Sequence, residues 1–311
     1  MSLLKSRYLV PGAFWLGLGA ALLALWLSGQ AGAAWQTVRD ARVVPLLLVI
    51  VVGVALPVIH ALRWQHVMRA LGTDIPASLA ADLTVSSSLF NYASPGFLGA
   101  PAKAFLANRS LQAPYPRTLL SMAFEQGLDF LVLLIASVVA LLVLDRGSFN
   151  DFLPDMRRST QLLLAIGVFA IVVFVVITSR RRVSRVLQRI AGAFQELWGK
   201  VDRRFVAMLT LLYWLAQVVV VALLLWALAL PLTITGVLAL ATLPLLAGQV
   251  VPLPGGVGAR EAAIVALAGA TGASATSLLG LAVLQRVLLV AALPLSLGIV
   301  RLARQPGGNA A

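Results

Sequence analysis

The chain has 311 residues, of which 60% are hydrophobic and only 11% are charged. Because a soluble domain carries roughly 25% charged residues, this composition excludes a soluble globular protein and predicts an all-α protein that crosses the membrane several times. The net charge of +13 does not indicate nucleic-acid binding, since cytoplasmic loops of membrane proteins carry an excess of Lys and Arg and the chain has no nucleic-acid motif.

The first predicted span covers about residues 9–28 and follows two basic residues, so the N-terminus is expected in the cytoplasm. This apolar stretch is too long for the core of a usual signal peptide, which favours an uncleaved span. A second span is predicted over about residues 43–62. It ends at Arg63 and Trp64, which are interpreted as ordinary anchors at the membrane interface.

The next predicted elements are a broken segment over 78–117 and a span over about 118–144. The broken segment becomes too polar after its glycines and prolines to contain a second crossing. The following span is apolar except for Glu125 and Asp129, which are four residues apart and therefore share one helix face. The loop at 145–158 has no net charge and carries no orientation signal.

The second half of the chain contains predicted spans over about 161–178, 205–228 and 277–300, with a second broken segment over about 233–275. The connector at 180–204 has eight basic and two acidic residues, a net charge of +6, so it should lie on the cytoplasmic side near anionic head groups.

The basic connector stays in the cytoplasm only if the first broken segment crosses the membrane an even number of times. We therefore predict about six full spans and two re-entrant, Gly/Pro-broken segments, with both termini cytoplasmic. The whole chain, 1–311, is then one transmembrane domain, in which repeat A (about 43–144) and repeat B (about 205–300) are inverted copies. The alternative for the second segment is a full span, because 233–252 is long enough to cross.

The two breaks resemble each other in sequence. Pro95-Gly96-Phe97-Leu98-Gly99-Ala100 and Pro254-Gly255-Gly256-Val257-Gly258-Ala259 both read Pro-Gly-x-apolar-Gly-Ala, at an offset of 254 − 95 = 159. Upstream, Ala70-Leu71-Gly72 corresponds to Ala227-Leu228-Ala229, and downstream Glu125-Gln126 corresponds to Gln285-Arg286. Broken segments in corresponding positions of two halves are typical of transporters, whose substrate site lies between them.

The candidate site combines the ionisable residues of the apolar core with the glycines of the breaks. Charges in a membrane are costly and must pair with one another, with substrate or with water in a cavity, and the glycines permit close backbone approach. The candidate binding residues are Arg260, Glu261, Arg286, Glu125, Asp129, Lys103, Gly255, Gly256, Gly258, Gly96, Gly99, Asn91 and Gln249.

Each of these residues also has a purely structural interpretation. Arg260 or Arg286 could neutralise the nearby acids and lock the helices together. The glycines could serve helix packing, and Asn91 and Gln249 could cap helices. With no cysteine and two histidines, thiolate catalysis is excluded and we expect neither a metal ion nor another cofactor.

The segment from Pro254 to Ala262 resembles the Pro-Gly-Gly-Leu-Gly-x-Arg-Glu-Ala motif of the lysylphosphatidylglycerol synthase transmembrane-region family, whose members are also described as flippase-like. The likeness extends over about residues 15–303. The chain departs from the family pattern at Phe97, Ala100 and Gln126, while Glu125 and Asp129 are kept. These departures concern which head group the protein handles.

The resemblance implies two re-entrant segments around a lipid-accessible cavity in a protein of the bacterial plasma (inner) membrane. The chain reaches residue 311 with no room for the cytosolic aminoacyl-transferase domain of some relatives, so we expect a non-enzymatic translocator of an anionic phospholipid or lipid-linked glycan. The alternatives are a membrane-embedded transferase acting on a polyprenyl-phosphate lipid and a small-solute transporter. Membrane lipids are the expected partners, and the apolar faces permit a homodimer.

Overall fold

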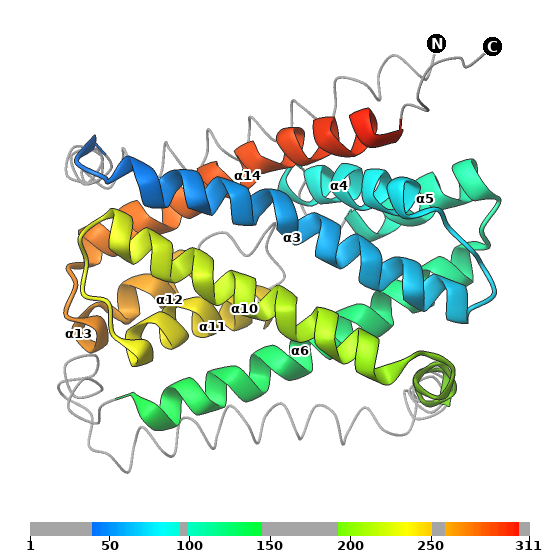
Figure 1. Cartoon of the computed structure of the whole chain (residues 1–311). Helices are drawn as coiled ribbons and strands as arrows, with labels where there is room; N and C mark the ends of the chain where they lie inside the picture. The colour runs from blue at the N-terminus through cyan, green and yellow to red at the C-terminus, as the bar shows by residue number, and fades with distance from the viewer. Residues whose placement is uncertain (1–38, 94–98, 145–191, 251–258, 305–311) are drawn as a thin grey trace.

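The computed structural model describes residues 39–93, 99–144, 192–250 and 259–304. All regular structure within these ranges is helical (Figure 1), which confirms the all-α class. The predicted spans at 9–28 and 161–178 and the loop at 145–158 lie outside the described residues.

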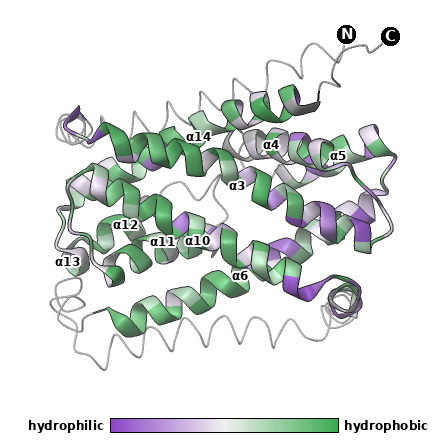
Figure 2. Cartoon of the chain, in the orientation of Figure 1, coloured by the Kyte–Doolittle hydropathy of each residue, from purple (hydrophilic) through white to green (hydrophobic). Residues whose placement is uncertain are grey.

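Four long helices match the four predicted spans that the structure describes. Each is long and apolar enough to cross a membrane, and large hydrophobic side chains such as Leu142 and Leu211 are exposed on their outer faces, as contact with lipid tails requires. Figure 2 shows the apolar residues along these helices. The four helices are α3 (Val43–Ala70), α6 (Tyr115–Val143), α10 (Arg203–Ala227) and α14 (Ala275–Arg304).

Shorter helices occupy the two predicted broken segments. They are α4 (Ala77–Ala93), α5 (Gly99–Leu111), α11 (Ile234–Val250), α12 (Ala259–Ala266) and α13 (Ala268–Thr271). The α4 and α11 helices have 17 residues each, or roughly 26 Å at 1.5 Å per residue, which is less than the bilayer core of roughly 30 Å. The breaks themselves, at 94–98 and 251–258, lie outside the described residues.

The helix bounds of the two halves differ by similar offsets, 157 residues at several bounds and 160 at the starts of α5 and α12 (259 − 99) and of α6 and α14 (275 − 115). The α3 and α10 helices end at Ala70 and Ala227 (227 − 70 = 157), and α4 and α11 share both bounds at the same offset (234 − 77 = 157; 250 − 93 = 157). Corresponding helices also make corresponding contacts. The α3 helix packs on its counterpart α10, and the contact of α4 with α14 has its counterpart in the contact of α11 with α6. These bounds support an internal repeat. The opposite orientation of the halves and the re-entrant course of the short helices stay predictions.

The matching ends of α3 and α10 are built in the same way. Thr73 donates its backbone N–H to Met68 and Gly72 donates to Arg69, and Leu230 and Ala229 make the equivalent bonds to Leu225 and Trp226. This is the Schellman pattern, which needs a residue in the left-handed conformation. That residue is Gly72 with φ 79° in the first half and Ala229 with φ 52° in the second.

Ala229→Gly is expected to stabilise the protein by about 1 kcal/mol, because a Cβ is unfavourable in the left-handed region and glycine is not. Ala229 is exposed, so no packing is lost. The midpoint of thermal unfolding in detergent, followed by tryptophan fluorescence, should rise for Ala229→Gly and fall for the matched variant Gly72→Ala. A lower midpoint for Ala229→Gly would contradict this explanation.

The described end of the basic connector forms a helix over 192–200 that packs on α6 and α3. Leu197 is buried, and the rings of Phe194 and Trp198 lie 5.4 and 6.0 Å from the ring of Phe124. On its exposed side, the hydrogen bond from Lys200 lowers the pKa of the Glu196 carboxyl. The connector is therefore amphipathic in this part, with an apolar face on the bundle.

Candidate functional site

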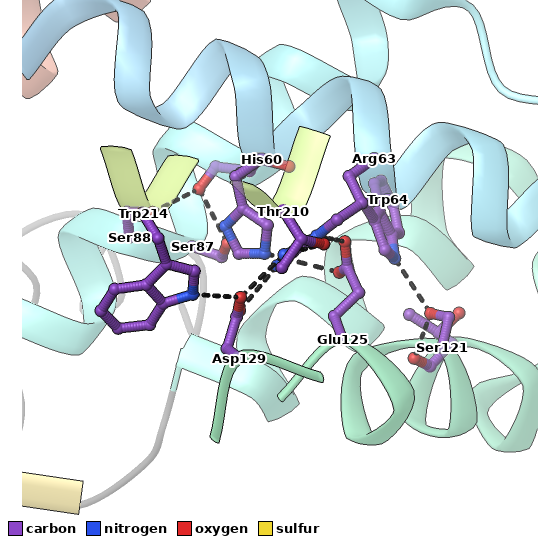
Figure 3. A network of polar contacts seen from close by, with 12 residues as sticks. His60, Arg63, Trp64, Ser87, Ser88, Ser121, Glu125, Asp129, Thr210 and Trp214 are labelled. Carbon is purple, nitrogen blue, oxygen red and sulfur yellow. Dashed lines mark hydrogen bonds and ion pairs between the residues drawn. The ribbon is translucent and has the colours of Figure 1, made fainter. Parts of the chain in front are cut away.

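A buried ion cluster joins α3 to α6 (Figure 3). The guanidinium of Arg63, which is 1% exposed, donates to both oxygens of Asp129: Nη1 to Oδ1 at 2.7 Å and Nη2 to Oδ2 at 2.6 Å. Its Nε donates to Glu125 Oε1 at 3.1 Å. Glu125 and Asp129 thus share one face of α6, as their spacing predicted, and one arginine holds both carboxylates.

Two side chains of α10 complete the cluster. Thr210 Oγ1 accepts from Arg63 Nη1 at 3.1 Å, and Trp214 Nε1 donates to Asp129 Oδ1 at 3.2 Å. Three long helices therefore meet at one set of charges. An ionised group in a membrane interior is tolerated only with such partners, so the cluster fixes the relative positions of α3, α6 and α10.

The interpretation of Arg63 and Trp64 as interface anchors was wrong. Trp64 is fully buried, and its Nε1 donates to Ser121 Oγ at 3.0 Å. Lys103 of α5, also buried, places its Nζ 4.0 Å from the centroid of the Trp64 indole, a cation–π contact. The signal in the sequence was the apolar pair Val67 and Met68, which follows Arg63 and predicts that the helix continues. In the structure α3 extends for nearly two turns beyond Arg63, and both of these residues are buried.

The arginines of the second half do not provide the cation for this cluster. Arg260, half-buried near the start of α12, donates from Nη2 to Gln285 Oε1 of α14 at 3.4 Å. Arg286 is the next residue on α14 and is also half-buried. The predicted constellation is therefore divided into an acidic part held by Arg63 and a basic part at the contact of α12 with α14.

The other predicted site residues are only partly covered by the structure. Gln249 lies near the end of α11, with its side-chain oxygen buried and without a hydrogen-bond partner among the described residues. Gly99 begins α5 and is buried. Gly96, Gly255, Gly256 and Gly258 lie outside the described residues, as do the side chains of Asn91 and Glu261.

A cavity lies beside the ion cluster, between α3, α4, α10 and α14. About 80 Å³ of it is open to water-sized molecules, which is room for several waters at roughly 10–15 Å³ each. Leu289 and Leu293 form its apolar side. Its polar groups are His60, Ser88, Tyr213 and Gln217. Sequence reasoning had not singled out these four residues, because each is an uncharged or single polar side chain within an apolar helix and carries no motif.

The cavity lies where the two halves meet. When α3 and α10 are aligned at their C-terminal ends, Leu56 and His60 of α3 correspond to Tyr213 and Gln217 of α10 (213 − 56 = 157; 217 − 60 = 157). All four residues line the cavity. Substrate sites of repeat-built transporters lie at such an interface. His60 also connects the cavity to the ion cluster, since its Nε2 lies 3.4 Å from Glu125 Oε2.

The site offers paired charges and hydrogen-bonding groups. In the part of the chain that the structure describes, no group of three or more His, Asp or Glu side chains could hold a metal ion. Long apolar helices around a buried ion cluster define the chain as a multi-pass helical membrane protein.

The lysylphosphatidylglycerol synthase TM region matches residues 14–298, and the chain belongs to this family. This confirms the resemblance seen in the sequence motifs and points to a lipid-related function in the membrane. Neither the curated proteins nor the solved structures contain a match to the chain.

Proposed function

We propose that the protein moves an anionic phospholipid or lipid-linked glycan between the leaflets of the bacterial plasma membrane, without chemical change to the lipid. The observation that carries the proposal is the polar cavity at the interface of the two halves, directly beside a buried ion cluster. Membership of a lipid-related membrane family supports the same function. In this proposal the short helices on either side of the breaks are re-entrant, and the two halves have opposite orientations.

Arg260 and Arg286 are proposed to hold the anionic head group. Both lie on helices that pack on each other, α12 and α14, and Arg260 is the second residue of α12, so the positive end of that helix dipole adds to its charge. A guanidinium binds a phosphate through two parallel hydrogen bonds. The side-chain oxygen of Gln285 accepts a hydrogen bond from Arg260 and orients its guanidinium.

The role of the acidic pair changes once the structure is considered. Arg63 of α3 pairs with both Glu125 and Asp129, and Lys103 of α5 supplies the second positive charge beside Glu125. Because they already have these cations, the two carboxylates do not compete with a lipid phosphate for Arg260. The proposed division is therefore a charge-balanced cluster that holds the bundle together and a basic region that binds the substrate.

The test is lipid movement in phosphatidylcholine vesicles that contain a trace of fluorescent phosphatidylglycerol and the purified protein. Arg260→Ala is expected to slow movement by about tenfold or more, because a hydrogen-bonded ionic contact contributes about 1.5–3 kcal/mol. Arg69→Ala, which removes an exposed arginine paired with Asp74, is the matched control and should move lipid at the wild-type rate.

Two results would contradict the proposal. Equal rates for Arg260→Ala and the wild-type protein would remove the binding role of Arg260. Mass spectrometry of the recovered lipid distinguishes translocation from group transfer, and a modified lipid formed only with protein present would favour the membrane-embedded transferase.

A further inference from the structure

The polar groups beside the cavity differ in how completely they are held. Asp129 receives three hydrogen bonds, two from Arg63 and one from Trp214. Among the described residues, Glu125 receives one, from Arg63 Nε to Oε1, and its Oε2 faces the imidazole of His60 at 3.4 Å. A proton on Asp129 would disrupt the two-fold bond to Arg63, whereas a proton on His60 would convert the contact with Glu125 into an ion pair.

His60 is also the most exposed member of this group. Its side chain is 32% exposed and lines the cavity, while the side chain of Glu125 is 3% exposed. A neutral imidazole has one N–H and one lone pair, so a hydronium ion in the cavity can give its proton to the ring and leave a water molecule. No oxidant or other reactant takes part in this step.

On this geometry, we propose that His60 and Glu125 form the proton-binding site that couples lipid movement to a transmembrane proton gradient. The inference rests on the proposed function, because it names the energy source of the same transporter. Chains of acidic residues and histidines inside membrane proteins commonly serve as proton relays.

The charges around His60 determine how the binding of one proton changes the attraction of the site for an anion. Among the described residues, the ionisable groups nearest His60 are Glu125 on α6 at 3.4 Å and the phenol of Tyr213 on α10, whose ring centroid lies 6.0 Å away. Arg63 on α3, Asp129 on α6 and Lys103 on α5 belong to the same cluster through Glu125 and Arg63. The α4 and α14 helices contribute Ser88, Leu289 and Leu293, which are uncharged.

Among the described residues, Arg63 and Lys103 carry two positive charges, and Glu125 and Asp129 carry two negative charges. The net charge of the cluster is therefore zero, and it becomes +1 when His60 takes up a proton. A net positive site in a low-dielectric surrounding attracts an anion strongly. The charge falls back to zero when the proton leaves, and the attraction is lost. Proton and anionic lipid therefore favour each other's binding, which is the reciprocal coupling that cotransport requires.

The experiment uses the whole protein in phosphatidylcholine vesicles with a trace of fluorescent phosphatidylglycerol, under an imposed pH difference of about one unit. One proton and one singly charged lipid carry no net charge together, so the gradient alone can drive them. We expect the labelled lipid to accumulate in the leaflet on the alkaline side, by up to about tenfold, because one pH unit is a tenfold ratio of proton activity. A protonophore should remove this bias.

His60→Gln and Glu125→Gln, which keep the size of each side chain, should distribute the label evenly between the leaflets. The control is His66→Gln. His66 is the other histidine of the chain, bonded to the backbone N–H of Asp202 and away from the cavity, and this variant should keep the wild-type bias. A bias that persists in His60→Gln would overturn the proposal.

If a variant fails to fold, the lipid distribution produced by the wild-type protein under the pH gradient can still test the proposal. Lipid that moves but distributes evenly under the gradient would reject the proton site and leave the proposed function intact. A pH-sensitive dye inside the vesicles measures proton entry independently of lipid movement, so it tests the proton-binding site separately from the proposed function. Proton entry that depends on His60 without any lipid movement would reject lipid translocation and keep the proton-binding site.

Discussion

Arg63→Ala is expected to lower the free energy of unfolding by about 3–5 kcal/mol, because it leaves two carboxylates buried without their cation. Arg63 is the shared partner of Glu125 and Asp129 and also bonds Thr210. The loss should be measured by unfolding in detergent with increasing sodium dodecyl sulfate. Arg69→Ala, at an exposed ion pair, should change the same quantity by less than about 1 kcal/mol.

A charge-free version of the cluster separates the loss of contacts from the burial of charge. Replacing Arg63 and Lys103 by Met, Glu125 by Gln and Asp129 by Asn together should recover most of the stability, because a neutral and well-packed core avoids the desolvation of ions, including buried Lys103. If the single and quadruple variants were equally unstable, the cluster would stabilise the bundle by packing rather than by charge balance.

Gly53→Leu is expected to destabilise the protein by about 1–3 kcal/mol through overpacking. Gly53 lies where α3 approaches α14: a Cβ at this position would be 2.9 Å from Ala292 Cβ and 3.2 Å from Leu289 Cδ2. Small residues allow membrane helices to come this close. Since Gly53 also lines the cavity, the same change should slow lipid movement.

Two matched variants test this explanation. Gly298→Leu, on α14 at a position where a Cβ would meet nothing within 4 Å, should be tolerated. Ala292→Gly, combined with Gly53→Ala, should restore the stability that Gly53→Ala loses alone, because it removes the atom at 2.9 Å. Failure of this rescue would locate the strain elsewhere on α3.

The four spans that the structure describes and the matching ends of α3 and α10 could be predicted from the sequence, because both depend on local patterns. A run of apolar residues predicts a spanning helix whatever it contacts, and Ala70-Leu71-Gly72 and Ala227-Leu228-Ala229 proved to be the same helix end. The role of Arg63 could not be predicted in this way. An Arg-Trp pair at the end of an apolar run has the same sequence appearance at an interface and in the interior, and its partners lie 62 and 66 residues away.

The candidate site was predicted in part for the same reason. Glu125 and Asp129 were recognised because a charge in an apolar helix is conspicuous, whereas the cavity residues Tyr213 and Gln217 are uncharged. Their importance follows from a position opposite Leu56 and His60, which only the packing of α3 on α10 creates.

The two halves match in backbone but differ in chemistry. When α3 and α10 are aligned at their C-terminal ends, Arg63 corresponds to Val220 (220 − 63 = 157). Val220 is buried in the apolar core. After a gene duplication, one copy of the unit would thus have kept or acquired the ionic cluster, while the other was free of it. Thr210 and Trp214 are the side chains through which α10 contacts this cluster. Under the proposed function, changes elsewhere in the second half can therefore alter lipid selectivity without disturbing the ionic core.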